Sequence, residues 1–261
     1  MKKLKLFVLF SLLTACSDNV KNTGGDYNDS GANSDLTKAI ELKPDNVYYS
    51  SGYVKSGFKD YTGAIADYTK AIELQPDYAD AYSARGNEKC NLQDYRGAIA
   101  DYTKAIELRP GFRLANYGAY TNRGNAKADL QDYTGAIADY NKAIELQPDD
   151  EPYIYRGNAK ADLQDYRGAI ADYTKAIELR PKNSKAYNNR GLAKYSLQDY
   201  RGAIADYNKA IELYPDYVNA YYNRGLAKAK LKDLDGACLD WSKAGELGYS
   251  GAYDLIKEIC N

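Results

Sequence analysis

Apolar residues recur at helical spacing along most of this 261-residue chain. One stretch shows the pattern clearly, with apolar side chains at Ala98, Ile99, Tyr102, Ala105, Ile106 and Leu108. Residues spaced in this way share one face of an α-helix. Pro110 follows, and the residue before a proline disfavours the α conformation. The pattern therefore predicts an amphipathic helix that ends just before Pro110.

The same helix is repeated along the chain. The phrase GAIADYTKAIELQP begins at Gly63, near copies begin at Gly97, Gly135, Gly168 and Gly202, and a divergent sixth copy begins at Gly236. The prolines that close the first five copies are 34, 38, 33 and 34 residues apart. A repeat of this length predicts a solenoid, in which each unit buries its apolar face against its neighbours.

Each copy follows another helical stretch that has a glycine in its middle. One such stretch runs from about Asp80 to Leu92 around Gly86. Glycine inside a helix costs ~1 kcal/mol of helix propensity, so its recurrence suggests that close packing needs the missing side chain. An alanine always comes twelve residues later, and we expect the two small residues to let the helices approach. The glycines are Gly52, Gly86, Gly124, Gly157, Gly191 and Gly225.

The unit resembles the tetratricopeptide repeat (TPR). Around Gly86, the residues that match the family's pattern are Tyr82, Gly86, Ala98, Tyr102, Ala105 and Pro110. The resemblance implies an all-α fold, a right-handed superhelical solenoid of antiparallel helix pairs whose first helices line the concave wall. It also implies a non-catalytic scaffold that binds an extended segment of a protein or peptide partner in this concave groove.

Five segments are expected along the chain. Residues 1–15 form a signal peptide, residues 16–33 a flexible tether, and residues 34–44 a partial repeat with a second helix only. Six repeat units follow over residues 45–248, and a capping helix occupies residues 249–261. Solenoids need such atypical terminal elements to cover the exposed core of the last repeat.

The N-terminus has the pattern of a bacterial lipoprotein signal. A short segment with three lysines precedes an apolar run from Leu6 to Leu13, which is too short to span a bilayer. The sequence Leu-Thr-Ala-Cys that ends at Cys16 resembles a lipobox, whose cysteine receives a diacylglycerol. We therefore expect an exported chain, anchored by lipid on Cys16 in the bacterial cell envelope, at its periplasmic or cell-surface face. The alternative is an ordinary secretory signal with a chance cysteine.

The composition argues against catalysis and against nucleic acid as a partner. The chain has no His, which removes the commonest general base and metal ligand, although enzymes built on paired carboxylates remain possible. The formal net charge is -1, so the chain has no excess of positive charge to attract a phosphate backbone. We expect no enzyme activity, no catalytic residue, no metal and no cofactor.

Two columns of the repeat depart from the family's pattern. An arginine precedes the glycine in five units, and a lysine follows it three residues later. Both positions should be buried, so the charges are expected to reach water or to pair with aspartates that recur in the second helix. Structural pairing is the preferred interpretation, and ligand binding is the alternative. The aspartates are Asp101, Asp139, Asp172, Asp206 and Asp240.

Asparagines gather on one face of the first helices. They stand two residues before or one residue after the glycine, and positions three apart share a helix face. In related TPR proteins, amides at these positions bind extended peptides, because an amide both donates and accepts hydrogen bonds. The resemblance therefore marks a peptide-binding set: Asn87, Asn122, Asn125, Asn158, Asn189 and Asn223. The lysines of a carboxylate clamp are missing, so recognition of an acidic C-terminus is not implied.

Other interpretations of these surfaces remain open. In the alternative to peptide binding, the asparagines are solvated polar residues on an exposed helix face. The alternatives to a peptide-binding scaffold are a structural assembly factor that acts through its convex face and an accessory module of an envelope enzyme complex. A column of tyrosines at the start of the second helices resembles an aromatic binding stripe, but is better explained by packing between repeats. These residues are Tyr95, Tyr133, Tyr166 and Tyr200.

Cys238 and Cys260 are expected to form a disulfide. Cys238 lies in the second helix of the sixth unit and Cys260 ends the capping helix, each eleven residues from Tyr249 in the turn between them. Antiparallel helices joined at that turn bring equidistant residues to matching heights, and an oxidising compartment permits the bond. The alternative is two buried free thiols. Cys90 stands alone in a first helix, without the acid–base neighbour that a nucleophile needs.

Overall fold

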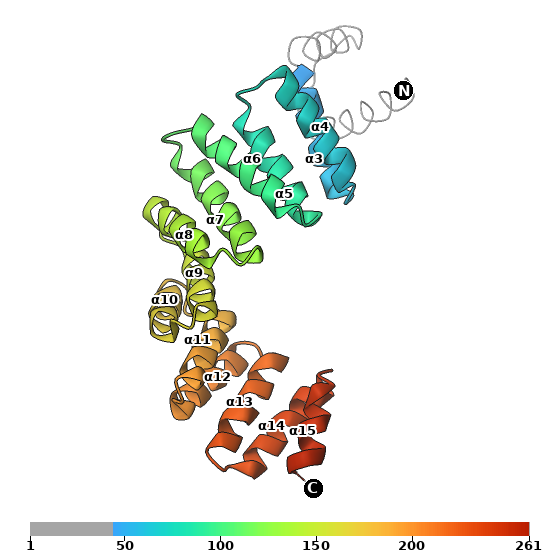
Figure 1. Cartoon of the computed structure of the whole chain (residues 1–261). Helices are drawn as coiled ribbons and strands as arrows, with labels where there is room; N and C mark the ends of the chain where they lie inside the picture. Colours follow the sequence, from blue (N-terminus) through green and yellow to red (C-terminus); the bar gives the residue numbers. More distant parts are fainter. Residues whose placement is uncertain (1–43, 261) are drawn as a thin grey trace, which may run out of the picture. The chain divides into compact units, whose positions relative to one another are not determined.

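A computed structural model describes residues 44–260, and within this range the chain is all α-helix without a strand (Figure 1). Six antiparallel helix pairs follow one another, and a single helix closes the series. The first helices of the pairs are α3 (Pro44–Gly57), α5 (Ala79–Asn91), α7 (Arg113–Asp129), α9 (Asp150–Asp162), α11 (Ser184–Ser196) and α13 (Val218–Lys230). The second helices are α4 (Tyr61–Leu74), α6 (Tyr95–Leu108), α8 (Tyr133–Leu146), α10 (Tyr166–Leu179), α12 (Tyr200–Leu213) and α14 (Leu234–Glu246), and the last helix is α15 (Gly251–Ile259). The signal peptide, the tether and the partial repeat that the sequence predicts lie outside the described residues, apart from Pro44.

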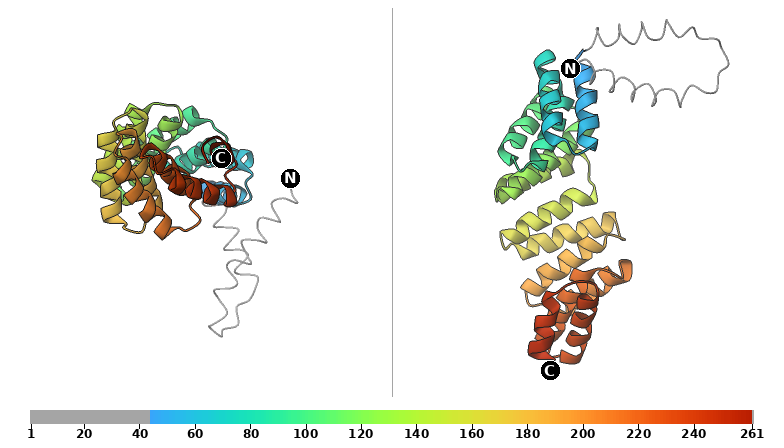
Figure 2. Two further views of the ribbon diagram at one scale, coloured as in Figure 1. Left: turned by 90° about the horizontal axis from the view of Figure 1, so that it is seen from below. Right: turned by 90° about the vertical axis from the view of Figure 1, so that its right-hand side faces the viewer.

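The chain divides into two compact units, one that ends at Leu108 and one that begins at Arg109. The described part of the first unit contains two helix pairs, and the second contains four pairs and α15. The four additional residues of the 38-residue spacing lengthen the first helix of the second unit, since α7 has 17 residues and α9 has 13. In the second unit the pairs stack in the order of the sequence, each second helix against the next first helix (Figure 2).

The ends of the helices follow from three recurring residues. An aspartate such as Asp165 caps the second helix, and its side chain accepts a hydrogen bond from the backbone N–H of Gly168. The residue before it, Gln164, has a φ of 61°, and this left-handed conformation ends the first helix. At the other end, Gln147 is extended because Pro148 follows it. The predicted stop before the closing prolines is therefore confirmed.

The core of each pair consists of alanines and one large aromatic side chain. Tyr102 is 1% exposed, and a Cβ atom added to Gly86 would lie 2.9 Å from its ring. The glycine thus makes room for the tyrosine ring, rather than for the alanine twelve residues later as we expected. In the sixth pair the same place is taken by Trp241, which an added Cβ at Gly225 would meet at 2.5 Å.

The arginine and lysine columns pair with the recurring aspartates, as predicted. Arg156 donates from Nε and Nη2 to the two carboxylate oxygens of Asp172, at 3.0 and 2.5 Å. Lys160 lies 2.8 Å from the same carboxylate, whose side chain is 5% exposed. The arginine also lies over the ring of Tyr153, 5.3 Å from its centroid. The same arrangement recurs around Asp101, Asp139, Asp206 and Asp240.

Helix α15 covers the end of the last repeat. Leu255, Ile256 and Ile259 pack against the cluster around Trp241. A disulfide joins Cys238 to Cys260, with the Cα atoms 5.9 Å apart, inside the about 7 Å that such a bond allows. None of the helices in residues 44–260 is long and apolar enough to cross a membrane.

Candidate functional site

The first helices of the second unit form one continuous surface, which we call the first-helix face. Helix α7 contacts α9, α9 contacts α11, and α11 contacts α13. Five of the six predicted peptide-binding asparagines lie on these helices. They are Asn122 and Asn125 on α7, Asn158 on α9, Asn189 on α11 and Asn223 on α13. Asn87 lies on α5 in the first unit.

The asparagines one residue after the glycine each accept a hydrogen bond from the core tyrosine of their own pair. Tyr173 donates its hydroxyl to Oδ1 of Asn158 at 2.8 Å. Tyr140 donates to Asn125 in the same way, and in the first unit Tyr102 donates to Asn87, both at 2.8 Å. These three amides therefore stabilise the fold, a role that the sequence pattern did not predict.

The asparagines two residues before the glycine link neighbouring first helices. Asn189 on α11 donates to Oδ1 of Asn158 on α9 at 3.0 Å. Asn188 donates to Oδ1 of Asn189 at 3.2 Å, and Asn223 on α13 donates to Oδ1 of Asn188 at 3.3 Å. Four side-chain amides thus form a chain of hydrogen bonds across α9, α11 and α13, which we call the amide chain. These asparagines are paired with one another rather than fully solvated.

Asn188 is the member of the amide chain that sequence reasoning missed. It is 6% exposed and occupies the place where a carboxylate clamp would have a lysine. Its neighbour Asn189 was predicted, and two consecutive asparagines before a repeat glycine occur only here in the sequence. That signal could have identified the pair.

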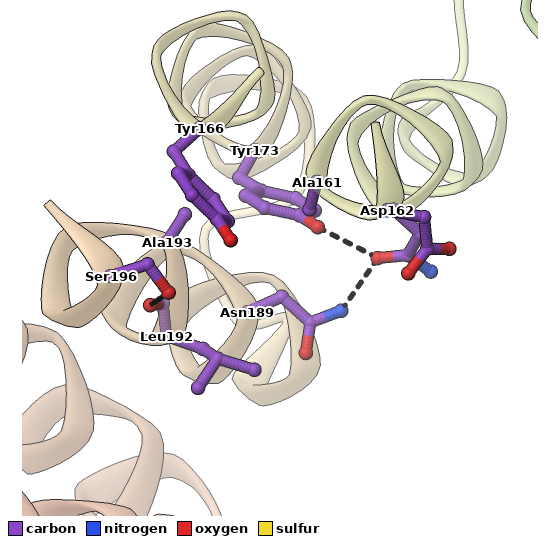
Figure 3. Close-up of a pocket in the computed structure, with 9 residues that line it drawn as sticks. Ala161, Asp162, Tyr166, Tyr173, Asn189, Leu192, Ala193 and Ser196 are labelled. Atoms are coloured by element: carbon purple, nitrogen blue, oxygen red, sulfur yellow. Dashed lines mark hydrogen bonds between the residues drawn. The ribbon is translucent and has the colours of Figure 1, made fainter. Parts of the chain in front are cut away.

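A hollow of ≈480 Å³ opens on the first-helix face beside the amide chain (Figure 3). Helix α10 contributes the rings of Tyr166 and Tyr173, and α11 contributes Asn189, Leu192 and Ser196 on the opposite side. The α9 side is formed by Asn158, Ala161 and Asp162, and Ala193 completes the lining. Tyr166 packs between repeats against the cluster that contains Ala186 and Ala193, as expected of the tyrosine column, and it also borders the hollow.

The hollow exists because two side chains are small at this junction. Between α7 and α9, Tyr155 stands at the repeat position that corresponds to Asn189. Its ring centroid lies 5.9 Å from that of Tyr140. Between α11 and α13, Tyr195 stands at the repeat position that corresponds to Ala161. Its ring centroid lies 5.2 Å from that of Tyr200. An aromatic ring therefore occupies each of the two neighbouring junctions of the second unit.

Burial shifts the titration of the core tyrosines. Desolvation raises the pKa of the Tyr102, Tyr140, Tyr173 and Tyr207 hydroxyls well above the usual value near 10. Desolvation and three nearby carboxylates raise the pKa of Tyr117 to about 12. These hydroxyls therefore stay protonated and neutral at physiological pH. In residues 44–260 no group of three or more His, Cys, Asp or Glu side chains could hold a metal ion.

Family models match most of the repeats. A model described as TPR repeat matches residues 59–88, 157–198 and 191–232. Two models described as tetratricopeptide repeat match residues 117–150 and 79–112. Together these matches cover more than half of the chain.

Solved structures share the fold. MamA is 28% identical with a TM-score of 0.57, and the match covers 62% of this chain and 93% of MamA. YrrB, a TPR protein with an unusual peptide-binding site, is 23% identical with a TM-score of 0.58, over 73% of this chain and 97% of YrrB. The C-terminal part of a TPR protein from Cytophaga hutchinsonii is 20% identical with a TM-score of 0.65, over 76% and 78%. No curated protein sequence matches the chain.

Proposed function

Because the chain belongs to the tetratricopeptide-repeat family, we propose that it is a non-catalytic scaffold that binds an extended peptide segment of a protein partner. The binding surface is the first-helix face of the second unit. Stacked helix pairs of this kind present long continuous surfaces, which such proteins use to bind their partners.

The amide chain is the observation that carries this proposal. Hydrogen bonds link Asn158, Asn189, Asn188 and Asn223 across three helices. Each amide has two donors and an acceptor with two lone pairs, and the bonds within the chain use only part of this capacity. The remaining donors and acceptors suit the N–H and C=O groups of an extended peptide, whatever its side chains are.

The similar solved structures support the fold of this chain and do not identify its ligand. YrrB has a peptide-binding site, but its 23% identity bears on the shared fold alone. The proposal therefore rests on the amides and the hollow of this chain.

Export and lipid anchoring are a second part of the proposal. The support is the sequence of residues 1–16, and the bond between Cys238 and Cys260 agrees with an oxidising compartment. Cys16→Ser should leave the precursor uncleaved or release soluble protein, because the acyl chains provide ~0.8 kcal/mol of membrane binding per buried methylene. Unchanged mass and unchanged membrane fractionation of this variant would contradict the anchor.

Site-specific photocrosslinking in living cells tests which surface binds. A photoreactive amino acid is placed at Leu192, which lines the hollow, and in a second strain at Ala171, which is exposed on the second helix α10. We expect a crosslinked partner from position 192 and none from position 171.

The alternative outcomes separate the rival functions. Adducts from position 171 alone would move the binding surface to the second helices and favour an assembly factor that acts through its convex face. A chain that gives no adduct from either position would not support a scaffold.

A further inference from the structure

The hollow between α9, α10 and α11 carries negative charge from one carboxylate. Asp162 is the single charged residue among those that line it. In the described part of the chain, the Asp162 carboxylate has neither a hydrogen bond nor an ion pair, whereas the nearby Asp172 holds an arginine and a lysine. An unpaired carboxylate beside a ligand site favours a positively charged group.

Asp162 does not stabilise α9, the helix on which it lies. Asp162 is the last residue of α9, where the helix dipole disfavours negative charge by about 0.3–1 kcal/mol. The side chain is exposed and supports no packing. A substitution that removes its charge should therefore leave the stability of the fold unchanged or slightly higher.

The remaining walls of the hollow suit an aliphatic stem that ends in a cation. The partly exposed ring of Tyr166 borders it, and a cation within about 6 Å of an aromatic face is attracted to the ring. The chain uses this contact elsewhere, since Arg156 lies over Tyr153. Leu192 and Ala161 offer apolar surface to the stem, and the oxygens of Asn189 and Ser196 are hydrogen-bond acceptors nearby.

We propose that this hollow receives a lysine or arginine side chain of the peptide partner, with its cation beside Asp162 and its stem against the ring of Tyr166. This inference rests on the proposed function and adds the chemistry of one contact. Because rings of Tyr155 and Tyr195 occupy the neighbouring junctions, the hollow sets the position of the basic residue along the first-helix face.

A random peptide library tests the inference without knowledge of the natural partner. Twelve-residue peptides are displayed and selected on the mature wild-type chain, on Asp162→Asn and on Asp129→Asn. Asp129 is the matched control, because it ends α7 as Asp162 ends α9 but lies at the filled junction. We expect lysine or arginine at one position of the peptides selected on wild type and on Asp129→Asn, and loss of this preference on Asp162→Asn.

Affinities of one selected peptide then quantify the contact. Replacement of its basic residue by citrulline or norleucine should weaken binding to the wild type about tenfold, and binding to Asp162→Asn less than about twofold. Asn189→Tyr, which copies Tyr155 of the preceding repeat, should fill the hollow and remove the difference between the peptides. Circular dichroism and urea unfolding check that each variant is folded.

The outcomes distinguish the inference from the proposed function. If peptides are selected without a preferred basic residue, or if the neutral replacement weakens binding equally in both proteins, the basic subsite is refuted and the peptide-binding scaffold stands. If no peptide is selected on the wild-type chain, both proposals are refuted together.

Discussion

Tyr173 donates its buried hydroxyl to Asn158 across 2.8 Å, and this bond recurs wherever a pair has an asparagine at this place. One repeat later Leu192 replaces the asparagine, and the buried hydroxyl of Tyr207 has no partner among the described residues. A buried hydroxyl without a partner costs about 1–3 kcal/mol. The second unit therefore contains a local defect next to the proposed binding surface.

Leu192→Asn should repair this defect. The new amide would accept the hydrogen bond of Tyr207, and Leu192 is 47% exposed, so little apolar burial is lost. We expect the free energy of unfolding to rise by about 1 kcal/mol, seen as a higher urea midpoint at unchanged slope. Tyr173→Phe is the control and should lower the free energy of unfolding by a similar amount. A lower midpoint for Leu192→Asn would contradict this account of Tyr207.

Removal of a buried aspartate should destabilise the fold far more than removal of an exposed acid from the same helix. Asp172→Asn leaves Arg156 and Lys160 without their carboxylate, and breaking a buried pair costs about 3–5 kcal/mol. Glu178→Gln breaks an exposed pair with Lys175 on the same helix α10 and should cost under about 1 kcal/mol. Urea unfolding measures both. Equal losses would show that the arginine column contributes no more than a surface ion pair.

High pH should unfold the protein cooperatively. Burial raises the pKa of five core tyrosines, so above pH ~10 the unfolded chain releases protons that the folded chain retains. Their stabilisation is complete below pH ~10 and falls as the pH rises further, by up to about 1.4 kcal/mol per pH unit for each tyrosine. Helical circular dichroism should be lost at the pH where tyrosinate absorbance rises steeply. Full tyrosinate formation with intact helices would contradict the prediction.

Cys260→Ser should loosen the C-terminal cap. The bond closes a sequence separation of 22 residues, and the chain-entropy model gives a stabilisation of about 3 kcal/mol. Trp241, the one tryptophan of the chain, lies in the cluster that α15 covers and reports this region by fluorescence. The variant and the reduced wild type should unfold at the same lower urea concentration, while Cys90→Ser changes little. A variant as stable as the oxidised wild type would refute a fastening role.

Sequence reasoning predicted several features that depend on one repeat alone, although not the bonds from the core tyrosines to Asn87, Asn125 and Asn158. The helix pairs, the stops before proline and the contact of Arg156 with Asp172 follow from the spacing of residues within a unit. The placement of Cys238 opposite Cys260 follows in the same way from equal distances to one turn. These relationships are set by helix geometry, which the sequence spacing determines.

Features that depend on two repeats together were not predicted. The amide chain and the hollow arise from the combination of side chains that meet at each junction, such as Ala161 with Asn189. A signal was present for the tyrosine bonds, because the units with an asparagine after the glycine all carry the core tyrosine fifteen residues later. Pairing across helices cannot be read from the helical period of either one.

The most direct test of the central claim is the mapping of a bound peptide onto the protein by nuclear magnetic resonance. A library-selected peptide is titrated into the isotope-labelled mature chain, and the backbone amide shifts are followed. The account predicts the largest shifts on the first-helix face, at Asn158, Asn189, Leu192 and Asn223. Shifts confined to exposed positions of the second helices, such as Lys175, would contradict it.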